Sequence, residues 1–270
     1  MFAVNDDGSE FRTLTERRSL SALGYRQDGG DIVALDVAEK DGHILMTREY
    51  VKEFSTGTRT ANEKEGLGVD LVDVVDGSRH PLERPDAEAT RYIADQTGRV
   101  RIKVRSLVDG GGMLKGDQTY VYRTKDSDAW KRLEDITIDG ETVNGFTAVA
   151  VDSDRDVAFG FVTRDGFDAL AEVTLDGLAK GRMLLARDDV DVDRLIRIGR
   201  QRRVVGASYA TEKREVEYFD EELKVLASGL SQALPDTPLI NIVGASADEN
   251  RLLIVASSDT QPGTSYLFDK

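Results

Sequence analysis

The sequence contains no cysteine, only two histidines and one tryptophan among its 270 residues. Without cysteine the chain forms no disulfide, no thiolate zinc site and no cysteine-dependent catalytic centre. No apolar run approaches the roughly 18–20 residues of a membrane-spanning helix. The start, MFAVNDDGSEF, lacks the basic residues and the apolar stretch of a signal peptide. We therefore expect no membrane partner, and the compartment, cytoplasmic or periplasmic, stays open.

Basic residues are also in deficit, with 36 against 50 acidic residues and a net charge of −14. A phosphate backbone would be repelled by this field, and no basic stripe interleaved with aromatics is present, so we expect no nucleic-acid partner. Hydrophobic residues make up 40% and charged residues 32% of the chain, which is typical of a soluble globular protein. The length suffices for one large β domain or two smaller ones.

Short apolar segments separated by Asp- and Gly-containing turns follow one another along the chain. Residues 146–186 contain four such segments of six to eight residues, rich in Val, Phe and Leu. These are strand lengths joined by hairpin connections. The stretch RVRIKVR (99–105) alternates apolar with basic residues, which predicts a half-buried strand with Arg101 on its exposed face.

Groups of four such segments recur at a spacing that predicts the fold class. The expected groups are 31–85, 89–135, 144–187 and 193–230, with partial groups at 2–15 and 239–270. An apolar residue followed by aspartate closes the third segment at Asp76, Asp176, Asp220 and Asp269, with gaps of 100, 44 and 49 residues. The first gap holds one extra group.

A period of about 40–50 residues with four strands per unit is typical of a β-propeller. We predict an all-β, single-domain propeller over 1–270, with four complete blades and partial blades at both ends. A β-sandwich or a solenoid explains the repeated closing aspartate less well. The half blades indicate a fragment of a larger, seven-bladed propeller. Alternatively, the two ends pair to close a five-bladed one.

The order of several segments resembles the N-terminal β-propeller of prolyl oligopeptidase-type (S9) serine peptidases, and more narrowly a bacterial S9-like α/β-hydrolase subgroup. The segments that carry this resemblance are DIVALDVAEKDGHILMTREY, VDVVDGSRHPLERPDAEATRYIADQTGRVRIKVR, DDVDVDRLI and SADENRLLIVASSDTQPGTSYLFDK. The resemblance implies that an α/β-hydrolase domain is the partner, that peptides are the substrates and that the propeller shields the active site from folded proteins.

The hydrolase domain that the resemblance implies is absent from this sequence, which has no Gly-x-Ser-x-Gly nucleophile elbow. The segment GASYA (206–210) has alanine in place of the second glycine and runs into a strand pattern, so we interpret Ser208 as a strand residue. GASAD (244–248) is interpreted as a turn. We assign no catalytic residue, no cofactor-binding residue and no metal ligand.

Other candidate sites also have simpler structural interpretations. His43 is expected to open a strand, and His80 to lie in a turn two residues after Ser78, a spacing that seldom supports a triad. The aspartates at 152, 154 and 156 have calcium-loop spacing but lack the glycine and the distal glutamate of such a loop, so a hairpin turn is expected. DDVDVD (188–193) is interpreted as a link between two blades.

Glycine-rich and inserted segments complete the candidates. DGGGMLKGD (109–117) lacks the Gly-Lys-Ser/Thr order of a phosphate loop, and GLGVDL (66–71) lacks the third glycine of a dinucleotide fingerprint. The polar insertion at 52–68 is a long loop of the kind that can carry binding. Residues 221–238 have leucines at a spacing of three and four, which predicts a helix packed on a blade and ended by Pro235.

The sequence therefore favours a non-catalytic propeller domain that gates substrate access in a serine peptidase. A free-standing five-bladed binding or scaffold propeller is the alternative, and a propeller hydrolase or lyase that holds a metal in its channel is a third. The acidic surplus suggests basic peptides as ligands. Open sheet edges recruit other chains, so dimerisation by edge pairing is also considered.

Overall fold

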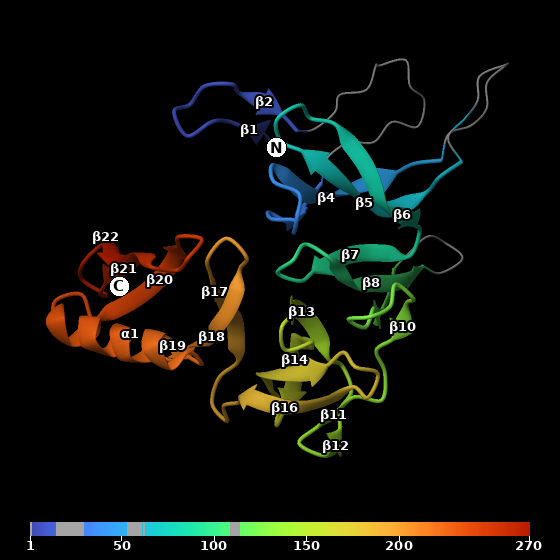
Figure 1. Cartoon of the computed structure of the whole chain (residues 1–270). Coiled ribbons are helices and arrows are strands. Elements are labelled where there is room, and N and C mark those ends of the chain that lie inside the picture. Colours follow the sequence, from blue (N-terminus) through green and yellow to red (C-terminus); the bar gives the residue numbers. More distant parts are fainter. Residues whose placement is uncertain (1, 15–29, 53–60, 62, 109–113) are drawn as a thin grey trace. The chain divides into compact units, whose positions relative to one another are not determined.

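The computed structural model describes residues 2–14, 30–52, 61, 63–108 and 114–270. In these ranges the chain is all-β except for one helix (Figure 1). It divides into two compact units, residues 1–134 and 135–270. The central residues of the insertion expected at 52–68 and of the glycine-rich segment at 109–117 lie outside the described residues.

Unit 1 contains a two-stranded hairpin and two four-stranded antiparallel sheets. The hairpin pairs β1 (Phe2–Ala3) with β2 (Arg12–Thr13). The first sheet is formed by β3 (Ile32–Ala34), β4 (His43–Tyr50), β5 (Gly66–Asp73) and β6 (Arg79–Asp86). The second sheet is formed by β7 (Ala89–Ala94), β8 (Val100–Val108), β9 (Leu114–Tyr122) and β10 (Lys131–Arg132). Each strand pairs with its neighbour in sequence, so both sheets are simple meanders.

Unit 2 contains three sheets and the helix. The first sheet consists of β11 (Thr137–Ile138), β12 (Glu141–Thr142), β13 (Thr147–Asp152), β14 (Val157–Arg164), β15 (Phe167–Thr174) and β16 (Lys180–Leu185). The second consists of β17 (Val192–Ile198), β18 (Arg203–Ala210) and β19 (Arg214–Tyr218). After α1 (Glu221–Ala233), the third consists of β20 (Leu239–Ala245), β21 (Arg251–Ser257) and β22 (Thr264–Asp269). This succession of small antiparallel meanders is a propeller-like all-β fold.

Two sheets differ from the four-stranded groups expected from the sequence. The sheet near 144–187 gains β11 and β12, because β11 pairs in parallel with β16. In the group at 193–230 only three strands form, because the predicted helix, α1, begins directly after the third strand and takes the residues of the expected fourth strand. The helix forms because its leucines repeat at helical spacing and the Asp220 carboxylate caps the N–H groups of Glu222 and Leu223.

Aspartates organise several of the turns between strands. A carboxylate oxygen of each accepts the backbone N–H two residues ahead, which fixes the turn locally. These aspartates are Asp7, Asp73, Asp76, Asp86, Asp95, Asp152, Asp176 and Asp248. At Gly77 and Gly177 the backbone is left-handed, with φ of 76° and 107°, a conformation that glycine adopts without a steric penalty. The Asp-Gly pairs of the sequence are therefore turn-forming elements.

In unit 1 the two four-stranded sheets share one apolar core. Its buried residues are Ala34, Leu45, Val69, Leu71, Ala89, Tyr92 and Val100. Tyr92 also donates its hydroxyl to the carbonyl of Leu67, at 2.8 Å, across the two sheets. Apolar side chains and this hydrogen bond together hold the sheets face to face.

The prediction that Arg101 lies on the exposed face of its strand is wrong. Its side chain is 1% exposed, lies 3.4 Å from the Asp95 carboxylate and donates from Nε to the carbonyl of Arg123. On the same strand Lys103 and Arg105 are half-buried, so this face of β8 is covered at Arg101 and partly open beyond it. A buried cation requires such a carboxylate partner, because its desolvation would otherwise be costly.

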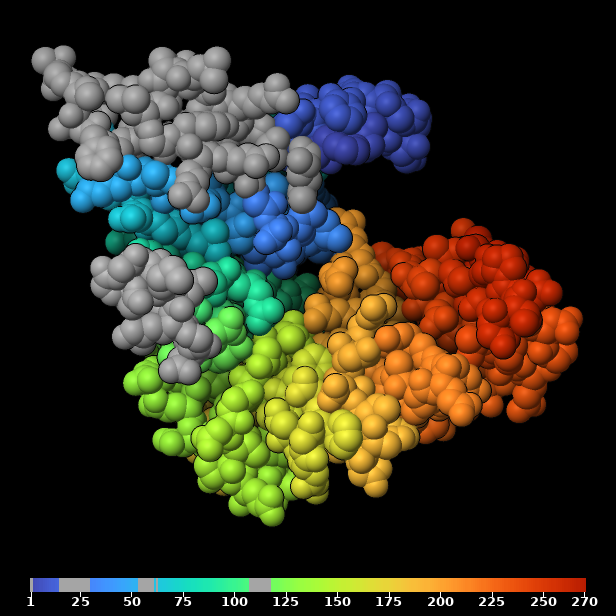
Figure 2. Space-filling view, turned by 180° about the vertical axis from the view of Figure 1, so that it is seen from behind, coloured from blue at the N-terminus to red at the C-terminus, as the bar shows by residue number. Residues whose placement is uncertain are grey.

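In unit 2, α1 forms a separate core with the sheet β17–β19 that precedes it and the sheet β20–β22 that follows it. The buried residues are Ile198, Val205, Tyr218, Leu223, Ile240, Ile242, Leu252, Ile254 and Ala256. Leu226, Leu230 and Leu234 pack against it from the helix. The prediction that the leucine face of this helix packs on a blade is confirmed. Both views show the segment from β17 to β22, orange to red, as adjoining elements (Figures 1 and 2).

Leu223 provides a direct test of this helix packing. Its side chain is 0% exposed, so we expect Leu223→Ala to lower the free energy of unfolding by about 2–5 kcal/mol through lost burial and a cavity. Val225 lies on the same helix but is 64% exposed, and Val225→Ala should change it by less than about 0.5 kcal/mol. Urea denaturation of the three proteins measures both values. Equal, small effects would contradict the packing.

Candidate functional site

The structure accounts for the serine and histidine candidates of the sequence. Ser208 lies in β18, as expected, and is fully buried. Its hydroxyl contacts Asp193 and Arg214 and no histidine. His43 opens β4 as expected, with Nδ1 at 3.0 Å from the carbonyl of Asp41. His80 lies in strand β6 and not in a turn, because β6 begins one residue before it and pairs with β5.

The aspartate candidates are parts of turns and links. Asp152 accepts the N–H groups of Asp154 and Arg155 in the turn between β13 and β14, so the expected hairpin is confirmed. The segment at 188–193 leads from β16 into β17, as expected. Ser246 and Asp248 form the turn between β20 and β21. Among the described residues, no group of three His, Cys, Asp or Glu side chains is arranged to hold a metal ion.

One cavity of unit 1, of about 580 Å³, lies beside Trp130. Two of its three cations are already engaged: the guanidinium of Arg123 lies 4.0 Å from the centre of the indole ring and pairs with Glu83, and Lys103 pairs with Asp86 at 2.8 Å. Glu83 and Asp86 belong to β6, whereas the two cations belong to the next sheet. This cluster therefore ties two sheets together and leaves little unsatisfied chemistry for a ligand.

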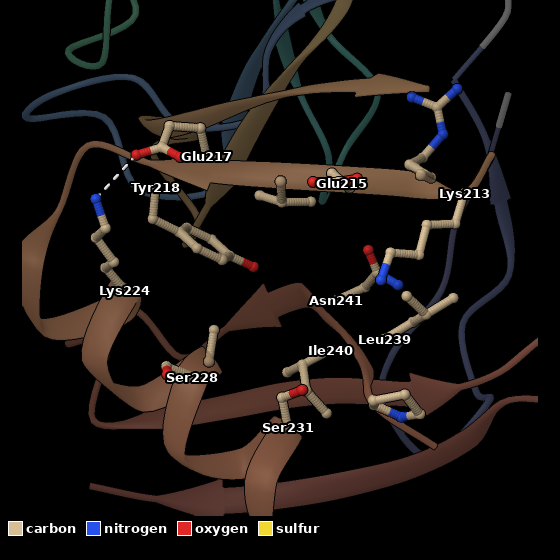
Figure 3. A pocket seen from close by; sticks show the side chains of 14 residues that line it. Lys213, Glu215, Glu217, Tyr218, Lys224, Ser228, Ser231, Leu239, Ile240 and Asn241 are labelled. Carbon is tan, nitrogen blue, oxygen red and sulfur yellow. Dashed lines mark hydrogen bonds and ion pairs between the residues drawn. The ribbon is translucent and has the colours of Figure 1, made fainter. Parts of the chain in front are cut away.

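The stronger candidate site is a groove in unit 2, which we call the β19 groove (Figure 3). It has a volume of about 330 Å³ and is lined by residues 213–218, by one side of α1 and by residues 238–241 at the start of β20. Figure 3 shows the Tyr218 side chain projecting into the space between β19 and α1, with Ser228 on the helix and Asn241 on β20 across from it. The groove thus combines an apolar floor with hydroxyl and amide groups.

Charged groups stand at both ends of the groove. Lys224 pairs with Glu217 at 2.9 Å, and the hydrogen bond that the Lys224 ammonium donates to the Glu217 carboxylate raises the pKa of this ammonium. At the other end lies Lys213, whose side chain is exposed. Burial raises the pKa of the Tyr218 phenol, so this side chain stays neutral and packs as an aromatic surface.

Behind the groove, β17, β18 and β19 are fastened by a single ion-pair cluster. Arg214 donates to both carboxylate oxygens of Asp193, at 2.7 and 2.8 Å, and to the Ser208 hydroxyl at 3.0 Å. These three residues come from the three strands of the sheet. The hydrogen bond from Arg214 lowers the pKa of the Asp193 carboxyl. The cluster thus holds the start of β19, and with it one end of the groove.

Sequence reasoning did not find the groove. The helix was predicted, and so was the strand that ends at Phe219. The signal that was missed is the short connection between them: α1 begins three residues after the end of β19, which leaves no residues for a fourth strand. A groove beside the third strand follows from that connection.

The Asp193–Arg214 pair predicts a pH dependence of stability. Because the pKa of Asp193 is lowered from its ordinary 3.8, its contribution is complete above pH 3.8 and is lost as pH falls through the lower native value. The wild type should unfold at a higher temperature than Asp193→Asn at pH 6, and the difference should shrink below pH 3.8. Thermal melts from pH 6 to pH 3 measure it. A difference in unfolding temperature that stayed constant from pH 6 to pH 3 would contradict a stabilising role for the ionised Asp193–Arg214 pair.

Comparisons with known proteins leave the family unassigned. No family model and no curated protein matches the sequence. Among solved structures, TolB from Acinetobacter baumannii is similar over 99% of this chain, with 10% identity and a TM-score of 0.35. The acylaminoacyl peptidase of Pyrococcus horikoshii is similar over 100% of it, with 14% identity and a TM-score of 0.41. The chain covers 45% and 43% of these two proteins, so it spans less than half of their length.

Proposed function

We propose that this chain is a non-catalytic, propeller-like module that controls which peptides reach the active site of a prolyl oligopeptidase-type serine peptidase. The order of its sequence segments resembles that family, and the meander of small antiparallel sheets agrees with the resemblance. The partner in this proposal is an α/β-hydrolase domain, and the ligands are short peptides. The observation that carries the peptide-binding part is the β19 groove, which runs along an open strand edge.

The architecture supports a role in binding because loops and strand edges stand on rigid sheets. Interior strands such as β8 and β14 are paired on both sides and largely buried, so they hold the surface elements in fixed positions. Ser208, the residue closest to a nucleophile motif, is buried in such a strand and bound to Arg214. It therefore serves packing and hydrogen bonding in this proposal, and the peptidase nucleophile belongs to the partner domain.

A free-standing binding or scaffold module is the second candidate. The open outer edges of β19 and β22 favour it, because each ends a three-stranded sheet in the described chain and exposed edges recruit further strands. In this case the ligand would be another protein or a second copy of the chain.

The reading frame after codon 270 and the activity of its product separate the two functions. We expect the frame to continue into a domain that contains a Gly-x-Ser-x-Gly elbow. The full-length protein should then cleave chromogenic short peptides and leave folded proteins intact. The purified 270-residue chain should release no product above the buffer rate.

The matched control is the full-length protein with the elbow serine changed to alanine, which should lose peptide cleavage and keep its fold. A stop codon after Lys270 would assign the free-standing role. Hydrolysis of a peptide or ester by the 270-residue chain itself would contradict both candidates, since each is non-catalytic.

A further inference from the structure

The β19 groove lies where other sheets of this chain place a fourth strand. β6 pairs with β5, β10 with β9, and β16 with β15, each antiparallel to the third strand of its meander. β19 is the third strand of its own meander and stands at the end of the sheet order β17-β18-β19. Within the described part of the chain no strand pairs with its outer edge.

The register of β19 shows which backbone groups face that edge. The N–H of Phe219 donates to the carbonyl of Val205 at 2.8 Å, and the carbonyl of Lys213 accepts from the N–H of Thr211 at 3.0 Å. Alternate residues of a strand direct their N–H and C=O groups to opposite sides. Residues 215 and 217 therefore pair with β18, whereas the N–H and C=O groups of Arg214, Val216 and Tyr218 face away from β18 along the outer edge.

We propose that the β19 groove is a strand-addition site that binds an extended peptide antiparallel to β19, with a carboxylate near the peptide's C-terminal end. The peptide replaces the missing fourth strand of the sheet. This inference rests on the peptide-binding part of the proposed function, since it uses the same groove, and it applies equally to a peptidase module and to a free-standing one.

An extended peptide is the ligand that matches the chemistry of the edge. Alternating donors and acceptors along a strand are matched by the backbone of another strand, as in known strand-addition complexes. Side chains of such a peptide would alternate between solvent and the groove, which Tyr218 and Ile240 line. Ser228 and Asn241 on the opposite wall can hydrogen-bond polar side chains (Figure 3). The five residues of β19 match a peptide of similar length.

Charge fixes the expected direction and the end group. In the antiparallel orientation the C-terminal end of the peptide reaches the start of β19, where Lys213 lies (Figure 3). Lys213 is exposed and takes part in none of the ion pairs of the described residues. The other two basic residues of the lining are already paired, Arg214 with Asp193 and Lys224 with Glu217. The groove therefore favours a peptide carboxylate at the Lys213 end.

The binding test uses the whole 270-residue chain and a fluorescein-labelled pentapeptide, Thr-Val-Thr-Val-Thr, with a free C-terminal carboxylate. Fluorescence anisotropy should show saturable binding. N-methylation of the alternate peptide residues whose N–H groups face β19 should weaken binding at least about tenfold. N-methylation of the other alternate residues, whose N–H groups face away from β19, should leave binding unchanged. Equal effects at all positions would overturn strand addition.

Lys213 is tested with the same probe. Lys213→Ala and the C-terminal amide of the peptide should each weaken binding about two- to fivefold, as expected for an exposed ion pair. The two changes together should weaken it no more than either alone, because they remove the same interaction. Lys125→Ala, an exposed lysine of the other unit, is the control and should leave binding unchanged. Equal affinities of the Lys213→Ala and Lys125→Ala proteins would overturn the predicted orientation.

Val216→Pro removes a backbone donor from the edge itself. The N–H of Val216 faces outward, so proline there should abolish binding and leave the pairing with β18 intact. Val216→Thr keeps both the N–H and the side-chain shape and should bind as the wild type does. Circular dichroism checks that both variants fold. If Val216→Pro does not fold, the N-methyl series decides the question without a protein variant.

Two outcomes would give the edge another role. No anisotropy change up to millimolar protein would overturn the proposal, even if the hydrolase domain is found downstream. A concentration-dependent dimer, seen by analytical ultracentrifugation and lost in Val216→Pro, would assign the edge to a second copy of the chain and overturn the peptide ligand. Conversely, peptide binding by a chain with no downstream hydrolase would support this site and contradict the peptidase role.

Discussion

Burial on both faces of small antiparallel sheets is the constraint on which this structure depends. A sheet of three or four strands satisfies its backbone hydrogen bonds internally, but its two faces must be covered by neighbours. In unit 1 the sheets β3–β6 and β7–β10 share the core around Leu45, Val69 and Tyr92. In unit 2 the last two sheets share a core with Leu223 of the helix. Each sheet is therefore stable only beside the next one, and the edges that remain open are the places where ligands can pair.

Strand lengths, turns and the order of the sheets could be predicted from the sequence, because alternation and Asp-Gly turns are local signals. Burial of the second face of a strand could not be predicted from these local signals. RVRIKVR has the pattern of a half-exposed strand, yet Arg101 is 1% exposed and lies beside Asp95. A local pattern records which face is apolar, whereas one hydrogen-bond partner of the buried Arg101 side chain is the carbonyl of Arg123, 22 positions away. The aspartate six residues earlier was the available hint.

The candidate site likewise combines parts that the sequence predicts with parts that it does not. The leucine spacing of residues 221–238 is a sequence signal, and the helix forms within that range, at Glu221–Ala233. The consequence of the helix for the sheet is not local. Because α1 takes the residues that form a fourth strand in other meanders, β19 keeps an open edge and a groove of about 330 Å³ remains beside it. Ser208, His80 and the aspartates of 152–156 do not line the groove, since they belong to strands and turns.

The aspartates in the turns account for part of the protein's acidic charge. At least eight carboxylates accept backbone N–H groups in turns, and the hydrogen bonds around Asp248 hold its pKa at about 2. These eight of the 50 acidic residues therefore serve turn construction, and their charge is not a record of which ligands the surface attracts. Part of the low isoelectric point of this chain is an architectural property, and ligand preference has to be sought in the side chains that the turns leave unengaged.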